Sequence, residues 1–484
     1  MASCAVGPDF VRPAAPAVSR YTRDLLPAET VVADGQAQRY RSGENIVPDW
    51  WRFFESTELD AIVARALADN PTLQSAQASL RESQHNLQAG YGVFFPEVDA
   101  NFGVNRQKPS PFRFGGYAPT NIFNLYTLGA SITYALDVFG GKRRMVEGLE
   151  AQADYQRYQM IGTYMSLSGN VVNACIAQAA YQAQIQATEK MIELQKEQLR
   201  LTKVQTDAGI VPYTNVLSIQ SQLSANEAIL PALRQKRVQA EHLLSTLSGH
   251  LPEERSFQAV DFAKLKLPQE LPVSLPSTLV RQRPDILAAE AQLHAASANV
   301  GVATADLFPS FTLSGSYGLS NTKFSHLSDA TSKFWSVGPT LSFPLFQGGT
   351  AWYRRQAAID AYQKSLADYR QTVLTSFQQV ADTLKALEHD AQGLQAQADA
   401  LRTAEEAWKL RDANYRAGLV GYLDVLSANA QFYQAKIKYL QISAQRYQDT
   451  AALFVALGGG WWSDPKFKTS FHAAELSTKE QTRK

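Results

Sequence analysis

The sequence predicts an α+β membrane protein with long coiled-coil helices and a transmembrane β-barrel. Each chain supplies four strands, so trimerisation completes the barrel. Three observations lead to this prediction. The chain of 484 residues contains one unit twice, and each copy has a helical pattern far longer than a globular helix and two segments with strand-like alternation. With 45% hydrophobic residues and a net charge of +1, the chain has the composition of an ordered protein.

The internal two-fold repeat is visible in motifs that recur at a nearly fixed distance. The motifs and their copies are Pro71 and Pro284, Pro96 and Pro309, and Ala208–Leu217 and Ala417–Leu426. The two proline pairs are each separated by 213 positions. Solenoid repeats have periods of about 20–50 residues, so a unit of this length indicates a duplicated domain instead.

The repeat sets the expected organisation of the chain. The predicted segments are an extended arm at 1–48, a first repeat at 49–250, a linker at 251–276, a second repeat at 277–462 and a polar tail at 463–484. Each repeat should contain a helix, a strand pair, a very long helix, a sharp turn and a returning helix. Asn70 before Pro71 predicts a helix start, because Asn is a favoured N-cap and Pro is favoured at the first helical position.

The arm begins with Cys4, one of two cysteines in the chain. Ala2 and Ser3 precede it and a Pro-rich stretch follows, as in a bacterial lipoprotein whose signal peptide has been replaced by an initiator methionine. We therefore expect a mature form in which Cys4 carries covalent lipid, such as palmitate; the alternative is an unpaired thiol. The neutral Ala5 favours sorting to the outer membrane. Cys175 lies in a helical pattern and should be a packed small residue.

Four segments alternate apolar with small polar residues. They are 98–105, 127–136, 310–319 and 335–343. Each is about ten residues long, which suits a transmembrane β-strand, although a half-buried soluble sheet alternates in the same way. The polar faces are small and almost uncharged, and the loops at about 106–124 and 320–333 are long, which favours the membrane interpretation.

Two helical patterns without proline follow the strand pairs, from about 141 to 207 and from about 349 to 416. At 1.5 Å per residue each would be about 100 Å long, which indicates coiled coil rather than globular core. Each should reverse at a glycine, Gly209 or Gly418, because glycine adopts positive φ at a helix C-terminus. Returning helices are expected over 213–248 and 422–457.

The strand count determines the expected assembly. Four strands cannot close a barrel, and an open edge cannot face lipid because its backbone groups would lack hydrogen bonds. Two chains would give eight strands, whose interior is filled by side chains, whereas three give twelve and an aqueous lumen. Ser, Thr and Gly on the polar faces favour the lumen, so we expect a homotrimer with three-fold symmetry.

Four motifs occur in order along residues 4–462. They are Cys4-Ala5-Val6-Gly7-Pro8-Asp9-Phe10-x-x-Pro13, Trp50-Trp51-x-x-Phe54 with Leu59 and Ala66-Leu67-x-x-Asn70-Pro71, Tyr415-Arg416-Ala417-Gly418-x-x-x-Tyr422-Leu423-Asp424-Val425-Leu426, and Ala456-Leu457-Gly458-Gly459-Gly460-Trp461. Together they resemble the outer membrane factor family, the TolC/OprM/NodT-type exit ducts of tripartite efflux pumps.

The resemblance implies a trimer with a twelve-stranded barrel in the Gram-negative outer membrane and an α-helical tunnel that crosses the periplasm. Such a duct conducts substrates passively from a periplasmic membrane-fusion adaptor and an inner-membrane transporter, here expected to be of the RND type. It needs outer-membrane lipid and no cofactor beyond the lipid on Cys4. The alternatives are the outer-membrane component of type I protein secretion and a passive solute channel.

The resemblance also implies roles for residues at the two turns. The expected periplasmic gate comprises Arg416, Leu423, Asp424 and Ser427, and the expected adaptor-docking tip comprises Asp207, Gly209, Tyr213, Gly418 and Tyr422. Family members often carry Asp at the position of Ser427. Asp424 lies on another helical face, where it either lines the lumen or bonds to a neighbouring helix. Arg416 is expected to pair with an acid on the adjacent helix.

Other functional classes fit the sequence poorly. It has no His/Glu metal spacing, glycine-rich phosphate loop or nucleophile elbow, so we predict neither an enzyme nor a metal site. Its near-neutral charge gives no electrostatic case for nucleic acid. A periplasmic coiled coil or adhesin would leave the four strand segments and Cys4 unexplained.

Overall fold

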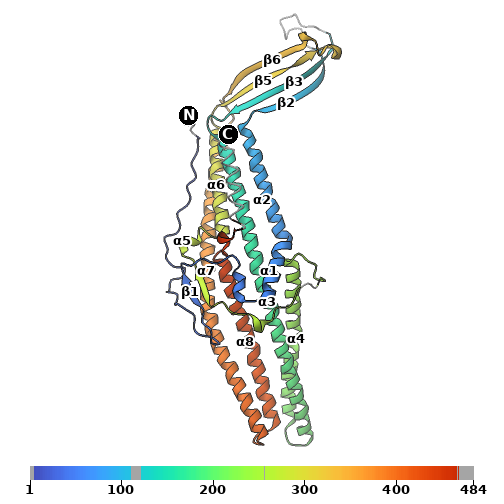
Figure 1. Ribbon diagram of the computed structural model, residues 1–484, viewed down its shortest axis with the longest axis vertical. Coiled ribbons are helices and arrows are strands. Elements are labelled where there is room, and N and C mark those ends of the chain that lie inside the picture. The colour runs from blue at the N-terminus through green and yellow to red at the C-terminus, as the bar shows by residue number, and fades with distance from the viewer. Residues whose placement is uncertain (1–4, 109, 111–120, 255–256, 466, 468–484) are drawn as a thin grey trace. The chain divides into compact units, whose positions relative to one another are not determined.

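A computed structural model describes residues 5–108, 110, 121–254, 257–465 and 467 (Figure 1). The chain forms two compact units, each built from both halves of the sequence. Unit 1 comprises 1–13, 79–157 and 288–370, and unit 2 comprises 14–78, 158–287 and 371–484. Cys4 and most of the loop predicted at 106–124 lie outside the described residues.

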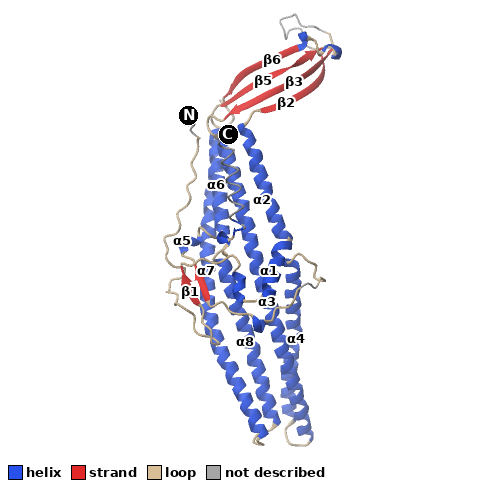
Figure 2. Ribbon diagram, viewed as in Figure 1, coloured by secondary structure: helices blue, strands red, loops and turns tan. Residues whose placement is uncertain are grey.

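Helices and strands follow one another in the order expected for a duplicated unit (Figure 2). The strands are β1 (Arg39–Ser42), β2 (Glu97–Gln107), β3 (Phe123–Leu136), β4 (Glu270–Val273), β5 (Ser310–Asn321) and β6 (Lys333–Ser342). The α-helices are α1 (Thr57–Asp69), α2 (Pro71–Gly90), α3 (Gly141–Asp207), α4 (Tyr213–Leu247), α5 (Pro276–Leu279), α6 (Pro284–Ala305), α7 (Thr350–Arg416) and α8 (Tyr422–Ala456). The short 3-10 helices are η1 (Trp50–Phe54), η2 (Tyr91–Phe94), η4 (Phe262–Lys264), η5 (Phe324–His326), η6 (Ala330–Ser332) and η7 (Trp461–Ser463).

The long hairpin helices of the two copies have the same lengths. α3 and α7 each contain 67 residues, and α4 and α8 each contain 35. The predicted long helices and their returning partners are therefore confirmed. Among the described helices, none has both the length and the apolar character that a bilayer-crossing helix requires.

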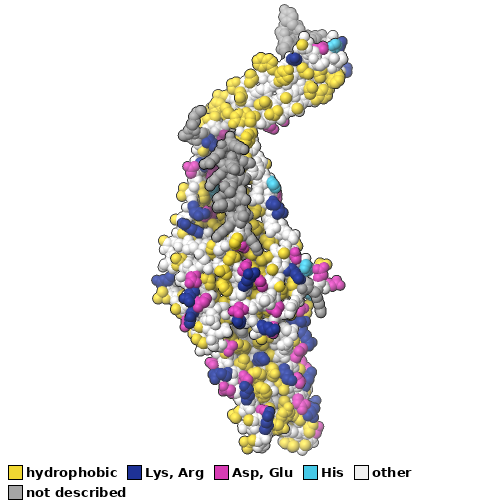
Figure 3. Space-filling model, in the orientation of Figure 1, with side chains coloured by type: hydrophobic (Ala, Val, Ile, Leu, Met, Phe, Trp, Pro, Cys, Tyr) yellow, Lys and Arg dark blue, Asp and Glu magenta, His cyan; other side chains and the backbone are white. Residues whose placement is uncertain are grey.

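Unit 1 contains an antiparallel sheet with strand order β2-β3-β5-β6. Its pairing aligns the apolar positions of all four strands, as in the row Val98, Ile132, Gly315 and Val337. The polar positions align in the same way, as in the row Asp99, Ser131, Ser316 and Ser336. Because side chains alternate across a strand, one face of the sheet is apolar and the other is small and polar. Figure 3 shows hydrophobic side chains gathered over the sheet, where Phe102, Trp335 and Val337 are 57%, 74% and 67% exposed.

Aromatic residues of η1 belong to the hydrophobic core of unit 2. Trp50 and Phe54 of η1 are at most 1% exposed, and the Trp50 ring stacks on Phe454 of α8 with 5.4 Å between ring centroids. Ser56 caps the next helix, α1, by accepting a hydrogen bond from the Leu59 amide at 3.2 Å. The motif Trp50-Trp51-x-x-Phe54 therefore joins the N-terminal segment to α8.

A small sheet in unit 2 was not predicted. β1 lies in the segment expected to be an extended arm and β4 in the expected linker, and the two pair in parallel over four residues. Strands this short contain too few alternating positions to show a period of two. Their pairing joins parts of the chain that are about 230 positions apart.

Arg446 is a buried charge beside this sheet, with 1% exposure. Its Nε donates to Gln38 Oε1 at 3.0 Å, and its Nη2 donates to Thr30 Oγ1 at 3.2 Å. Gln38 Nε2 in turn donates to Thr450 Oγ1 at 3.0 Å. These bonds fix the N-terminal segment against α8, and burial lowers the pKa of Arg446.

We expect a carboxyl pair between α7 and α8 to make the stability of unit 2 depend on pH. Burial, followed by a hydrogen bond to Asp449, raises the pKa of Asp390 to about 7, while Arg446 opposes this shift. An unfolded Asp titrates near about 3.9, so between roughly pH 4 and 7 the folded chain binds more protons than the unfolded chain. Stability should therefore fall as the pH rises through this window.

We expect Asp390→Asn to flatten this dependence, because an amide does not ionise. The denaturation midpoint of the detergent-solubilised protein should fall less in the variant than in the parent between about pH 5 and pH 8. Asp399→Asn is the matched control, since Asp399 lies on the same helix and its side chain is 61% exposed. An equal fall in the parent and in Asp390→Asn would contradict the expectation.

Candidate functional site

The two turns between long helices have nearly identical backbone geometry. After α3, Gly209 has φ of +73° and the Ile210 amide donates to the Gln205 carbonyl at 2.8 Å. After α7, Gly418 has φ of +75° and the next amide, that of Leu419, donates to a carbonyl at 2.9 Å. This bonding satisfies helix-terminal carbonyls that would otherwise lack partners. The predicted reversal at both glycines is confirmed.

The residues proposed for adaptor docking lie at or beside these turns. Asp207 ends α3 and is exposed, and Tyr213 begins α4 with 64% exposure. Tyr422 begins α8 with 41% exposure, and its ring lies 5.3 Å from that of Tyr415. Ile210 is also 70% exposed, so the first turn presents apolar side chains. Sequence reasoning did not single out Ile210, although it lies inside the recurring motif.

The residues proposed for the gate differ in their surroundings. Leu423 and Ser427 are half-buried, whereas Arg416 and Asp424 are exposed. Asp424 Oδ2 accepts a hydrogen bond from the Gly421 amide at 3.1 Å, so in this chain it caps the start of α8. From the sequence we expected Asp424 either to line the lumen or to bond to a neighbouring helix, and this capping role was not predicted.

Arg416 has a different partner from the expected one. Its Nη2 lies 2.7 Å from Asp412 Oδ2, four positions earlier in α7, rather than beside an acid of the adjacent helix. Four-residue spacing places both side chains on the same helical face. Within this chain Arg416 therefore pairs along its own helix, and its pairing with an acid of an adjacent helix stays a prediction.

Glycine at the second turn should be required for its conformation rather than for space. A Cβ atom at Gly418 would meet no atom within 4 Å, but φ is +75°. Gly418→Ala should destabilise the turn by about 1–2 kcal/mol through backbone strain. Limited proteolysis and hydrogen exchange at the tip should detect the loss. Gly162→Ala, also free of contacts within 4 Å but inside α3, should instead stabilise its helix by up to about 1 kcal/mol.

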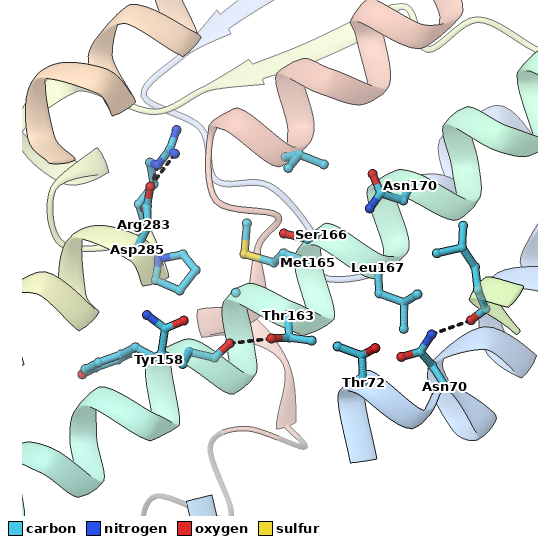
Figure 4. Close-up of a pocket in the computed structure, with 15 residues that line it drawn as sticks. Asn70, Thr72, Tyr158, Thr163, Met165, Ser166, Leu167, Asn170, Arg283 and Asp285 are labelled. Atoms are coloured by element: carbon cyan, nitrogen blue, oxygen red, sulfur yellow. Dashed lines mark hydrogen bonds and ion pairs between the residues drawn. The ribbon is translucent and has the colours of Figure 1, made fainter. Parts of the chain in front are cut away.

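A second candidate region is a cavity of about 540 Å³ in unit 2 (Figure 4). Equivalent positions of the two repeats contribute to its lining. Asn70 Nδ2 donates to the carbonyl of Leu247 at 2.8 Å, and Arg283 Nη1 donates to the carbonyl of Ala456 at 2.8 Å. Each repeat thus connects the start of one helix to the end of the returning helix, with different side-chain chemistry.

The cavity lining is mainly neutral. Its charged members, Arg283 and Asp285, form an ion pair with 2.7 Å between Nη2 and Oδ2. Because these two side chains bind each other, they are not arranged as an acid and a base for catalysis. Among the described residues, no group of three or more His, Cys, Asp or Glu side chains could hold a metal ion.

Comparison with known proteins gives the same interpretation as the fold. The chain is 30% identical over 430 residues to the pyoverdine export outer membrane protein OpmQ of Pseudomonas aeruginosa, covering 88% of this chain and 90% of the relative. It is 26% identical to the probable outer membrane lipoprotein SilC of Salmonella typhimurium, covering 95% and 96%. The solved structure of the outer-membrane channel OprN superposes with a TM-score of 0.82 at 28% identity, covering 95% and 100%.

These matches confirm the predicted resemblance, the fold class, the outer-membrane location and the role of an efflux exit duct. They indicate a channel rather than an enzyme. The family described as outer membrane efflux protein matches residues 62–250 and 275–459, which is most of the chain and includes both turns. The chain therefore belongs to the outer membrane efflux protein family.

Proposed function

We propose that three copies of this chain form a passive exit duct that receives substrates from a periplasmic adaptor and an inner-membrane transporter of the RND type. The observation that carries this proposal is the four-stranded sheet with an aligned apolar face and two edge strands. β2 and β6 each pair with one described strand only. An unpaired edge is unfavourable in lipid, so β6 of one copy pairs with β2 of the next until a twelve-stranded barrel closes.

The polar face of the sheet supports an aqueous lumen. The hydroxyl groups of Ser316 and Ser336 form a hydrogen bond between β5 and β6 at 2.8 Å. Between β3 and β5, the hydroxyl oxygens of Thr127 and Ser320 lie 3.5 Å apart. Small hydroxyl side chains leave space inside a barrel, whereas large ones would fill it. A passive, wide conduit needs no catalytic residues, and we propose no cofactor for it apart from the lipid on Cys4.

The names of the relatives support a pump context. One of them is an antibiotic efflux pump outer membrane protein and another is a toluene efflux pump outer membrane protein, both from Pseudomonas putida. We extend the pump context to this chain and leave its cargo unassigned. We also retain the five predicted segments, with boundaries at 48, 250, 276 and 462, as the proposed domain organisation.

The tips of the two hairpins form the proposed periplasmic mouth and adaptor contact. The docking surface consists of exposed Tyr213 and Tyr422, together with Asp207, Gly209 and Gly418 at the two turns. Arg416, Leu423, Asp424 and Ser427 supply the gate, where three copies of each residue approach the symmetry axis. An exposed pair such as Arg416–Asp412 contributes only about 0–1 kcal/mol, so closure depends on several weak contacts repeated by symmetry.

Conductance in planar bilayers tests this mouth. Combined Arg416→Ala and Leu423→Ala should raise single-channel conductance while the trimer persists, because both changes shorten side chains at the narrowest point. The matched control is Lys409→Ala with Leu410→Ala, which removes another exposed i,i+4 ion pair and a 63% exposed leucine from the same helix. A tip variant that conducts no better than the control variant would place the gate elsewhere.

A further inference from the structure

The N-terminal arm is fastened to unit 1 by specific contacts. The Val6 amide donates to the Phe139 carbonyl at 3.0 Å, and the Asp9 carboxylate accepts from Arg144 Nη2 at 2.5 Å. The Arg144 side chain is 7% exposed, so this is a largely buried donor. The Phe10 ring stacks on His294 with 4.3 Å between centroids. The motif Gly7-Pro8-Asp9-Phe10 therefore holds the arm in one register.

This register places the start of the arm beside Gly140. A Cβ atom at Gly140 would lie 2.6 Å from the Ala5 Cα, so glycine permits close packing of the two backbones. Cys4 directly precedes Ala5 in the sequence. A lipid on Cys4 would therefore be attached one residue from the Ala5–Gly140 contact.

The residues on both sides of Gly140 line a groove of about 550 Å³ in unit 1. This volume lies within the range of about 300–1,000 Å³ that is typical of small-molecule sites. Its apolar lining includes Leu136, Val138, Phe139, Met145, Phe308 and Phe311. Phe139 and Phe308 stack with 4.7 Å between ring centroids. Val138, Met145 and Phe308 remain 44%, 36% and 39% exposed, so apolar surface is available to a ligand.

Of the three charged groups of the lining, Asp306 is exposed to solvent, and the other two have hydrogen-bond partners. Asp137 accepts from Arg143 Nε at 2.9 Å and from the Lys142 amide at 3.0 Å. Lys142 Nζ donates to the carbonyls of Val93 and Ala135, each at 2.8 Å. These bonds reduce the demand of both charges for water, which favours an apolar occupant.

We propose that this groove binds an acyl chain of the lipid on Cys4. The inference rests on the proposed lipidation and adds its binding site, which the arm register brings next to the modified residue. The arm contacts and the groove together hold the anchor at a fixed position on the chain instead of leaving it on a free tether.

Photo-crosslinking tests the proposal on the full chain expressed with a signal peptide. Cells are supplied with a fatty acid that carries a diazirine, the membranes are irradiated, and mass spectrometry identifies adducts that join the Cys4 peptide to other peptides. We expect these adducts at Val138–Met145 and at Ala305–Phe311. Met145→Lys should reduce them by about tenfold, because a charge in the groove disfavours the hydrocarbon. Leu374→Lys, which replaces a 64% exposed leucine outside the groove, should leave them unchanged.

The intact mass of each preparation distinguishes a failure of Cys4 lipidation from a failure of acyl-chain binding in the groove. An unmodified Cys4 thiol would overturn both the lipidation and the groove assignment. A lipidated Cys4 whose adducts go to phospholipid or to mid-strand positions of β2 and β6 would retain the lipid anchor and overturn the groove. Loss of adducts with Leu374→Lys as large as that with Met145→Lys would also overturn it.

Discussion

Replacing Ile132 or Leu313 by arginine is expected to cost about 2–4 kcal/mol of folding free energy in a bilayer. Both side chains belong to the apolar face of the sheet, where they are 48% and 44% exposed. Ile132 aligns with Val98 and Gly315, so its neighbours offer no polar partner to a guanidinium. Facing lipid, the charge would lose water without compensation.

The neighbouring positions provide matched controls. Thr133 and Thr312 lie one residue away from the test positions and belong to the polar face of the sheet. Arginine there should be tolerated because it would face the aqueous lumen. Urea unfolding of protein inserted into lipid vesicles measures all four variants. Equal costs on both faces would contradict a membrane barrel with a wet interior.

Trp50→Ala should strongly destabilise unit 2, with a cost of about 3–5 kcal/mol. Trp50 is 1% exposed and stacks on Phe454, which is fully buried. Truncation would leave a cavity where η1 meets α8, since close-packed neighbours relax only partly.

The midpoint of denaturant unfolding in detergent measures this effect. Leu410→Ala is the control, because Leu410 is 63% exposed and its truncation should change the midpoint little. Similar midpoints for Trp50→Ala and Leu410→Ala would show that the aromatic cluster does not hold the N-terminal segment in place.

The strands and the hairpins could be predicted because their signals are local. Alternation over about ten residues defined each strand, and the observed pairing of Ile132 with Val98 and Gly315 follows from keeping apolar residues on one face. A glycine after a long helical pattern defined each turn. Asn70 was recognised as an N-cap, and its Oδ1 accepts from the Leu73 amide at 3.0 Å.

Features that depend on distant residues could not be predicted in this way. The pairing of β1 with β4 and the burial of Arg446 against Gln38 join positions more than two hundred residues apart. Asp424 and Arg416 were recognised as tip residues, but the hydrogen bond from the Gly421 amide to Asp424 and the ion pair of Arg416 with Asp412 were not predicted. The groove beside Gly140 arises where strand ends and helix starts meet, and no single segment contains its pattern.

The size of the detergent-solubilised particle tests the central claim most directly, because barrel closure requires other copies of the chain. Light scattering with the detergent contribution subtracted should give a protein mass three times that of one chain. Circular dichroism of the same sample should show mostly helix. A stable particle with the mass of one or two chains would contradict the twelve-stranded duct.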